Sequence, residues 1–251
     1  MNDLIKTSFN DRPPKAVILA GGRGTRLMPY TTFLPKPLMP IGDNPILEIV
    51  VRKFSECGLK NIIISVGHLA ELITTFFGAG EKWGVDIEYV VEDKPLGTMG
   101  PLHLIQDTGE NFFVMNGDIL TDLDLPALYK GHVESGAIMT VATCRRNVDI
   151  DFGILSYDAE NRRIDSFKEK PTLFYDVSMG IYVLSKRCLE YIPKNEYFGF
   201  DNLITRLLQK GEIVRAHPHK GMWLDIGRES DYRQANELMA QAYREGKNAI
   251  I

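Results

Sequence analysis

Two basic side chains and a cluster of glycines lie close together near the start of the chain. The apolar run 16–19 leads into the glycine-rich segment 21–24, and Arg26 and Lys36 follow. The backbone N–H groups of glycines, which no side chain hinders, can converge on an anion. With a guanidinium and an ammonium group beside them, they predict a binding site for a group more highly charged than one phosphate monoester.

Two well-known phosphate-binding motifs do not fit this stretch. The dinucleotide motif G-x-G-x-x-G opens a helix, but Leu27 stands where its third glycine belongs, and Pro29 and Pro35 prevent a regular helix start. The P-loop ends in Gly-Lys-Ser/Thr, which the segment 24–26 does not match. The remaining interpretation is a long basic loop that covers a nucleotide. The glycines alone would also be compatible with a simple turn that binds nothing.

Aspartates follow two apolar stretches further along the chain. Asp118 comes shortly after the run 112–115, and Asp225 follows 222–224. A carboxylate at the carboxyl end of a buried strand is costly unless it meets a cation. Beside phosphate groups that cation is most naturally Mg²⁺, which prefers oxygen ligands. For Asp118 the alternative is a turn aspartate after Asn-Gly.

Strands and helices must alternate to position these groups. The apolar and amphipathic patterns predict strands over 16–19, 61–66, 85–91 and 112–115, and helices over 45–57, 70–77 and 102–106. We expect a further helix near Leu125, capped by Asp122 or Asp124. This order is typical of an α/β fold with a parallel sheet covered on both faces, which binds ligands at the carboxyl ends of its strands.

The second half of the chain alternates less regularly. Its predicted strands are 137–143, 153–157, 164–168, 177–184 and 214–217. Helices are predicted from Phe200, with Asp201 or Asn202 as the cap, and over 229–244. Because no linker or repeat divides the chain, we expect both halves to form a single domain.

Composition narrows the possible partners and the compartment. The chain has 251 residues, 44% of them hydrophobic and 25% charged, as in ordinary globular proteins. A net charge of −4 argues against a nucleic-acid partner. Three widely spaced cysteines favour a reduced, cytoplasmic protein over a disulfide framework. No apolar run approaches the roughly 18 residues of a membrane span, and no leader pattern is present, so we expect no membrane partner.

The basic loop resembles the signature of a known family. The order Gly-Gly-Arg-Gly-Thr-Arg-Leu-x-Pro over 21–29, followed by Pro-Lys-Pro over 35–37, is similar to that of the sugar-1-phosphate nucleotidylyltransferases. The resemblance extends over roughly 15–232. It implies a Rossmann-like, mostly parallel mixed sheet flanked by helices, as in nucleotide-diphospho-sugar transferases. The implied reaction joins a nucleoside triphosphate and a sugar 1-phosphate into a nucleotide sugar, with release of pyrophosphate.

The resemblance also implies the roles of five charged residues. Arg26 would stabilise the leaving pyrophosphate, Lys36 would lie near the α-phosphate, and Lys170 would hold the sugar phosphate. Asp118 and Asp225 match the two aspartates that bind Mg²⁺ in the family, so Mg²⁺ is the implied cofactor.

The remaining site residues fall into a nucleotide group and a sugar-phosphate group. The implied nucleotide-binding residues are Leu19, Ala20, Gly21, Gly22, Gly24, Thr25, Gly97, Thr98 and Gly117. The implied sugar-phosphate-binding residues are Gly153, Glu169, Lys170, Ser178 and Gly180. Without the resemblance, Thr98 would be read as a helix cap and Glu169 and Lys170 as solvated surface charges. Ser178 and Met179 replace the Asn-Ala pair that is usual in the family, which removes an expected sugar contact.

These roles suggest a division of the chain. We expect an N-terminal extension over 1–14 and a nucleotidyltransferase domain over 15–251. Within that domain, 15–135 would bind the nucleotide, 136–227 would bind the sugar phosphate, and 228–251 would form the C-terminal helix.

Several alternatives stay open. The stretch 96–100 resembles guanylyltransferases for mannose- or heptose-type sugar phosphates more than thymidylyl- or uridylyltransferases, so GTP is favoured over UTP, CTP or dTTP. A non-catalytic, nucleotide-sensing regulatory homologue is a second reading, although such proteins usually lose one of the charged residues. The missing third glycine argues against a dinucleotide-dependent dehydrogenase. A homodimer is the default expectation for the oligomeric state.

Overall fold

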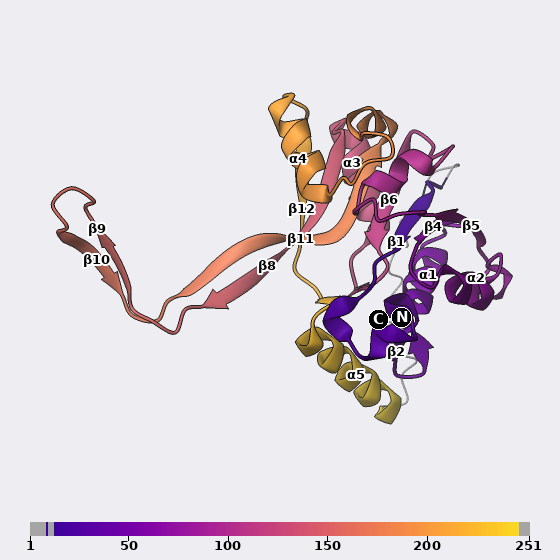
Figure 1. Ribbon diagram of the computed structural model, residues 1–251, viewed down its shortest axis with the longest axis horizontal. Coiled ribbons are helices and arrows are strands. Elements are labelled where there is room, and N and C mark those ends of the chain that lie inside the picture. The colour runs from indigo at the N-terminus through magenta and orange to yellow at the C-terminus, as the bar shows by residue number, and fades with distance from the viewer. Residues whose placement is uncertain (1–8, 10–12, 246–251) are drawn as a thin grey trace, which may run out of the picture.

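Seven strands form the central sheet of the computed structural model, which describes residues 9 and 13–245 (Figure 1). The strand order is β12-β8-β11-β6-β1-β4-β5. The strands are β1 (Ala16–Ala20), β4 (Asn61–Val66), β5 (Asp86–Val91), β6 (Asn111–Asn116), β8 (Met139–Asp149), β11 (Thr172–Ser185) and β12 (Val214–His219). Only β11 runs antiparallel to its neighbours β6 and β8, so the predicted mostly parallel mixed sheet is confirmed.

Alternate residues of the central strand β1 point into different apolar clusters. Ala16 and Ile18 belong to a cluster that includes residues of α1 (Ile46–Glu56), α2 (Ala70–Phe77) and α3 (Leu125–Ser135). Val17 belongs to a second cluster with α4 (Phe200–Gln209). Because side chains alternate along a strand, a continuous apolar run must be covered on both faces. The helices therefore flank the sheet on both sides, as the sequence predicted.

A third apolar cluster lies beneath the basic loop. It joins Leu27 and Met39 of the loop to Leu224 and Ile226. The C-terminal helix α5 (Glu229–Arg244) contributes to the same cluster. Two short strand pairs border this region: β2 (Pro40–Ile41) with β3 (Asn44–Pro45), and β7 (Ile119–Thr121) with β13 (Trp223–Asp225).

The helices predicted over 45–57, 70–77 and 229–244 are confirmed to within about one residue at each end. The helix predicted over 102–106 is wrong, since only a short 3₁₀ helix (Gly100–Leu104) forms there. The N–H groups of Met99 and Gly100 both donate to the carbonyl of Phe198, which ties this segment to a distant part of the chain.

The cap of α3 is one of the two that the sequence left open. The Asp124 carboxylate caps α3 by accepting from the N–H of Ala127 at 2.9 Å, whereas Asp122 accepts from the imidazole of His219. The caps predicted for α4 are wrong, because Gly199 is the N-cap and Asp201 and Asn202 lie inside the helix. The Asn202 side chain accepts from the N–H of Gly199 at 2.9 Å.

Two strands are longer than the sequence predicted. β8 ends at Asp149, although the predicted strand was 137–143. β11 begins at Thr172, although the predicted strand was 177–184. The hairpin β9 (Ile154–Tyr157) and β10 (Ile164–Lys168) follows at the far end. We call residues 145–176 the arm, because they project from the body of the molecule (Figure 1). The apolar pattern stops near Cys144, so hydropathy could not show that backbone pairing goes on.

Most residues at the two ends of the chain lie outside the part that the structure describes. The extension predicted over 1–14 lies outside the described residues apart from Phe9, Pro13 and Pro14, and so does 246–251 of the predicted C-terminal segment. Phe9 packs edge-on against Phe113 and Tyr129. None of the described helices combines the length and apolar character needed to cross a membrane.

A buried histidine makes the stability of this fold depend on pH. His132 lies between Thr140 Oγ1 at 2.8 Å and Asn111 Oδ1 at 3.1 Å, and burial lowers its pKa from 6.5 to about 4. Between these values the unfolded chain binds a proton that the folded chain does not. We expect the free energy of unfolding to fall by about 1.4 kcal/mol for each pH unit from 6.5 down to 4.

Urea unfolding at several pH values measures this slope. His132→Gln should flatten it, whatever the variant's overall stability, whereas His68→Gln, at a partly exposed position, should leave it intact. An unchanged slope in His132→Gln would show that other groups carry the pH dependence.

Candidate active site

One cavity of about 430 Å³ opens at the carboxyl ends of β1 and β6. All nine predicted nucleotide-binding residues line it: Leu19, Ala20, Gly21, Gly22, Gly24, Thr25, Gly97, Thr98 and Gly117. Arg26, Lys36 and Asp118 line it as well. The sequence analysis missed five further lining residues: Pro37, Glu92, Pro95, Asn116 and Tyr197. Segments from the basic loop, the 92–98 loop and the end of β6 therefore meet around one space.

Close backbone approach explains two of the glycines at this edge. The N–H of Gly117 donates to the carbonyl of Leu19 at 2.9 Å, and a Cβ at Gly117 would lie only 3.1 Å from that oxygen. A side chain at Gly21 would collide with the carboxylate of Glu92. At both positions a neighbouring group occupies the space that a side chain would enter, namely the Leu19 carbonyl at Gly117 and the Glu92 carboxylate at Gly21.

Glu92 connects three of the segments around the cavity. Its carboxylate accepts from Ser65 Oγ on β4 at 2.9 Å and from the N–H of Leu96 at 3.2 Å. It also packs against Gly21. The carboxylate therefore holds the 92–98 loop against the basic loop. Glu92 follows β5 directly, and its place at a strand end was the one signal that could have revealed it.

The 97–100 segment is fixed by the region that precedes α4. Gly97 has a left-handed φ of 78°, and a Cβ there would lie 2.8 Å from the carbonyl oxygen of Phe198. Thr98 Oγ1 accepts from the N–H of Phe200 at 2.8 Å. The Thr98 hydroxyl thus binds at the start of α4, about a hundred residues away, instead of capping a helix of its own.

Four charged side chains meet beside the cavity. Lys36 Nζ forms an ion pair with Asp118 Oδ2. Asp225 lies opposite Ile119 in the β7–β13 pair, and the N–H of Ile226 donates to the carbonyl of Asp118 at 3.0 Å. The two aspartates predicted to bind metal therefore sit on neighbouring segments, although more than a hundred residues separate them in the chain.

Gly227 marks the point where these charges converge. A Cβ at this position would lie 2.6 Å from Lys36 Nζ, 2.7 Å from Arg26 Nη2 and 2.9 Å from Asp225 Oδ1. The N–H of Gly227 also donates to Asp225 Oδ1 at 2.9 Å. The missing side chain leaves room for both basic groups. Gly227 was not predicted as a site residue, and its position two residues after Asp225 was the only clue.

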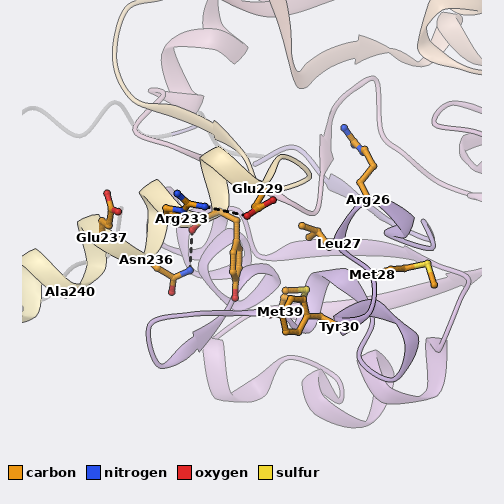
Figure 2. A pocket seen from close by; sticks show the side chains of 11 residues that line it. Arg26, Leu27, Met28, Tyr30, Met39, Glu229, Arg233, Asn236, Glu237 and Ala240 are labelled. Carbon is orange, nitrogen blue, oxygen red and sulfur yellow. Dashed lines mark hydrogen bonds and ion pairs between the residues drawn. The ribbon is translucent and has the colours of Figure 1, made fainter.

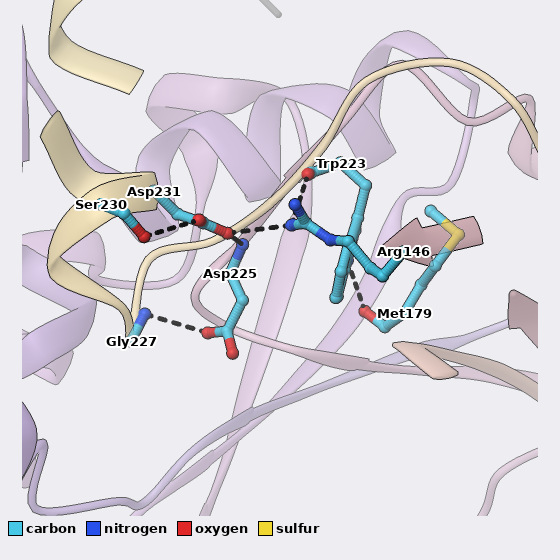
Figure 3. A network of polar contacts seen from close by, with 7 residues as sticks. All are labelled: Arg146, Met179, Trp223, Asp225, Gly227, Ser230 and Asp231. Carbon is cyan, nitrogen blue, oxygen red and sulfur yellow. Dashed lines mark hydrogen bonds and ion pairs between the residues drawn. The ribbon is translucent and has the colours of Figure 1, made fainter. Parts of the chain in front are cut away.

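A polar network holds Asp225 from behind (Figure 3). Asp231 Oδ2 accepts from the N–H of Asp225 at 3.0 Å and from Arg146 Nη2 at 3.1 Å. The Arg146 guanidinium lies over the ring of Trp223, 4.6 Å from its centre. Trp223 Nε1 in turn donates to the carbonyl of Met179 at 2.9 Å. Nothing in the sequence distinguished Asp231 from the other acids of α5.

Helix α5 also holds the β2–β3 hairpin that follows the basic loop. Tyr232 Oη donates to the carbonyl of Pro40 at 2.9 Å, and the N–H of Gly42 donates to Asn236 Oδ1 at 3.1 Å. Between the loop and α5 lies a second cavity of about 630 Å³ (Figure 2). Loop residues such as Met28 and Tyr30 form one side of it and α5 forms the other, where Glu229 is already paired with Arg233 at 3.2 Å; none of the predicted nucleotide-binding residues lines it. We therefore place the candidate site in the smaller, charged cavity.

The structure divides the predicted sugar-phosphate residues between two places. Ser178 and Gly180 lie in an irregular part of β11, where Ser178 Oγ donates to Tyr182 Oη at 3.2 Å, and burial raises the pKa of Tyr182 to about 12. A Cβ at Gly180 would lie 2.6 Å from Asn116 Nδ2, so this glycine adjoins the cavity wall. The other three, Gly153, Glu169 and Lys170, lie on the arm and do not line the cavity.

Residues 15–242 match the family described as nucleotidyl transferase. The chain is 35% identical to a UTP–glucose-1-phosphate uridylyltransferase of Synechocystis, with 94% of this chain and 66% of the relative covered. It is 31% identical to the catalytic subunit beta of mannose-1-phosphate guanylyltransferase of Danio rerio, with 92% and 66% covered. The chain thus spans just under two thirds of the length of these relatives.

Two solved structures are similar along nearly their whole length. HddC from Yersinia pseudotuberculosis, solved with GMP-PN, has a TM-score of 0.68 and 27% identity, with 90% of this chain and 99% of HddC covered. A protein of Bacillus anthracis assigned as a glucose-1-phosphate thymidylyltransferase has a TM-score of 0.71 and 27% identity, with 89% and 94% covered.

Gly227 provides a test of the charge cluster. Gly227→Ala should leave the fold intact, because the atoms that its methyl group would displace are mainly the movable ends of Lys36 and Arg26. Displaced cations bind phosphate less well, so we expect the affinity for a nucleoside triphosphate, measured by calorimetry, to fall about tenfold. Gly131→Ala, where the added methyl group meets nothing, is the matched control. Equal affinities of the two variants would contradict the cluster.

A second test concerns the network behind Asp225. Asp231→Ala removes a buried carboxylate and leaves the Arg146 guanidinium and the Asp225 N–H without their acceptor, so we expect a loss of about 3 kcal/mol in urea unfolding. Glu229→Ala removes an exposed acid from the same helix turn, whose pair with Arg233 is solvated, and should change stability by less than about 0.5 kcal/mol. Similar losses in both variants would show that the network contributes little.

Proposed function

The chain belongs to the nucleotidyl transferase family, as its basic loop predicted, and on this premise we propose that it joins a nucleoside triphosphate to a sugar 1-phosphate. The products are a nucleotide sugar and pyrophosphate. One observation carries the proposal: the nine candidate nucleotide-binding residues and three of the candidate catalytic residues surround a single cavity. A nucleotide sugar of this kind would serve as a precursor of cell-surface polysaccharides or glycoconjugates.

The chemistry needs no nucleophile or general base from the protein. An oxygen of the sugar 1-phosphate, already anionic near neutral pH, attacks the α-phosphorus of the triphosphate in line. A new P–O bond forms, and the bond between the α-phosphorus and the bridging oxygen to the β-phosphate breaks. The obstacle is the approach of two polyanions, so catalysis consists of positioning and charge neutralisation.

We assign the chain's basic groups to successive parts of this reaction. Arg26 and Lys36 line the cavity, and their charged ends meet beside Gly227. Arg26 stabilises the charge that develops on the leaving pyrophosphate, and Lys36 holds the α-phosphate. Lys170 holds the phosphate of the sugar, with Glu169 accepting from sugar hydroxyls. Glycine N–H groups of the basic loop bind the remaining phosphate oxygens.

The acids of the site fit a Mg²⁺ cofactor. Asp118 and Asp225 present carboxylate oxygens from neighbouring segments, and Mg²⁺ typically binds one or two carboxylates together with substrate phosphates. Within the described residues no group of three or more histidines, cysteines or acids could hold a metal by itself. The other ligands would thus be phosphate and water. The bound ion would supply positive charge beside the reacting phosphate groups.

We propose GTP as the nucleotide and a hexose or heptose 1-phosphate as the acceptor. The resemblance of the 96–100 stretch to guanylyltransferases supports this choice, as do the mannose-1-phosphate guanylyltransferase relative and the HddC structure with GMP-PN. UTP is the main alternative, because the uridylyltransferase relative is similarly close in sequence. We propose a cytoplasmic location, because the sequence has only three, widely spaced cysteines.

Pyrophosphate release with Mg²⁺ tests the proposal, over a grid of GTP, UTP, CTP, dTTP and ATP against several sugar 1-phosphates. We expect one combination to be strongly active. Asp118→Asn and Arg26→Ala should each lower turnover by about a hundredfold or more, because each removes charge complementarity at the reacting phosphates. The exposed Asp86, at the opposite end of the sheet, provides the control Asp86→Asn, which should retain full activity.

An inactive grid, with nucleotide binding retained, would favour a regulatory homologue instead. Near-normal turnover in Asp118→Asn or Arg26→Ala would contradict the role of that residue.

A further inference from the structure

The arm contacts the body at its root, where Arg146 binds Asp231 and lies over Trp223, and its strands pair only with each other farther out. Residues 145–149 pair with 172–176, whereas the pairing of β12 with β8 stops at Cys144 and that of β6 with β11 covers only 181–185. Five paired residues extend the ribbon by roughly 17 Å beyond the sheet. The hairpin β9–β10 lies farther out still (Figure 1). The arm therefore holds its tip away from the body.

The joint between the paired ribbon and the β9–β10 hairpin carries a chemical cluster of its own. A Cβ at Gly153 would lie 3.2 Å from Glu169 Oε2, and Lys170 Nζ lies 2.9 Å from Asp151 Oδ1. Lys170 has a φ of 38°, in the left-handed region that residues with a side chain rarely adopt. Backbone strain of this kind gathers at functional sites, where it fixes the direction of a side chain. Here it lies on a residue that the proposed function uses to bind phosphate.

The cavity on the body is incomplete without this cluster. Its only basic lining residues are Arg26 and Lys36, both of which the nucleotide phosphates require. A sugar 1-phosphate brings up to two further negative charges to the same place. No residue of the arm lines the cavity in this structure. The cation and carboxylate that suit the second substrate thus lie on the part of the chain that points away.

The surface of the arm is also unusually apolar for a solvated ribbon. Its large exposed side chains are Val148, Phe152, Leu155, Tyr157, Ile164, Phe167, Phe174 and Tyr175. Phe152, at the root of the hairpin, is 77% exposed. An isolated two-stranded ribbon is only marginally stable in water. Of these, Leu155 lies opposite Phe167 and Tyr157 opposite Ile164, so the four share one face of the hairpin. An exposed apolar face of this kind is typical of a protein–protein interface.

We propose that two copies of this chain exchange arms, so that Gly153, Glu169 and Lys170 of each copy complete the nucleotidyl-transfer site on the body of the other. This inference rests on the proposed function. A two-fold arrangement covers both arms at once and uses the same surfaces twice, as symmetric dimers do. A second copy is the occupant favoured by the structure, because the groups missing from each body are those on the other copy's arm. Folding back onto the same body would require the paired ribbon to bend sharply or open.

Complementation between two inactive chains tests the exchange. One chain carries Asp118→Asn and has an intact arm, and the other carries Glu169→Ala with Lys170→Ala and has an intact body. The two chains carry different affinity tags, are produced together and are purified through both tags. With exchanged arms, each heterodimer contains one complete site, so we expect about half of the wild-type turnover per dimer.

The reciprocal heterodimer gives the opposite result. It pairs a wild-type chain with a chain that carries all three substitutions. Exchanged arms leave no complete site in this heterodimer, so we expect its turnover to fall to the background of the triple variant. If each arm serves its own body, the wild-type chain keeps its site and about half of the turnover remains. That result, or an inactive first heterodimer, would overturn the proposal.

The mass of the chain in solution separates this inference from the proposed function. The full chain should be a dimer at micromolar concentration by light scattering. Asp149 and Thr172 lie directly opposite each other, so an Asn-Gly turn can replace 150–171 and close the shortened ribbon. This shortened chain should be a monomer that still binds the nucleotide. A monomeric full chain would overturn arm exchange, whereas a dimeric, catalytically inactive full chain would overturn the proposed function alone.

Discussion

The candidate site depends on the mutual compensation of four charges in a small space. Lys36 is almost buried, and its ammonium group forms an ion pair with Asp118. The ends of Arg26 and Asp225 lie beside it around Gly227. An unpaired charge at a largely buried position would be costly, and two acids or two bases alone would repel each other. The buried ammonium group of Lys36 is therefore tolerable because Asp118 pairs with it, and the more exposed Arg26 and Asp225 add one charge of each sign beside that pair.

This compensation requires that distant segments be held in register, which explains much of the architecture. The β7–β13 pair brings Asp225 next to the segment of Asp118, and Asp231 fixes the backbone of Asp225 from α5. The basic loop has no α-helix of its own and is held by the apolar cluster beneath it, and the β2–β3 hairpin that follows it is held by hydrogen bonds to α5. The last helix of the described chain thus positions charges that are encoded near its beginning. Arg146 extends the same network to the root of the arm.

Local chemistry in the sequence was enough to predict the sheet, most helices and the residues that surround the charged cavity. An apolar run such as 61–66 is stable only as a strand that helices cover on both faces of the sheet. Gly21 and Gly24 lie where the loop must bend. Contacts between distant segments left no such trace. Thr98 looked like a local cap and instead binds the start of α4, and Asp231 is one acid among several in its helix. The arm escaped detection because the paired residues beyond Cys144 are held together by backbone hydrogen bonds, which the order of apolar residues does not reveal.

In the proposed reaction the two substrates make different demands on the protein, and the fold reflects the difference. The triphosphate must be held with its α-phosphorus fixed for in-line attack, and the groups around it come from segments anchored in the core, such as Lys36 and Gly117. The candidate groups for the sugar phosphate belong to an exposed ribbon that has no core of its own. Bringing them to the cavity would bury apolar arm residues and add a cation at the same time. Burial of the apolar arm residues is favourable and can offset the cost of taking the charged groups out of water. Formation of the complete site is therefore coupled to the docking of the arm.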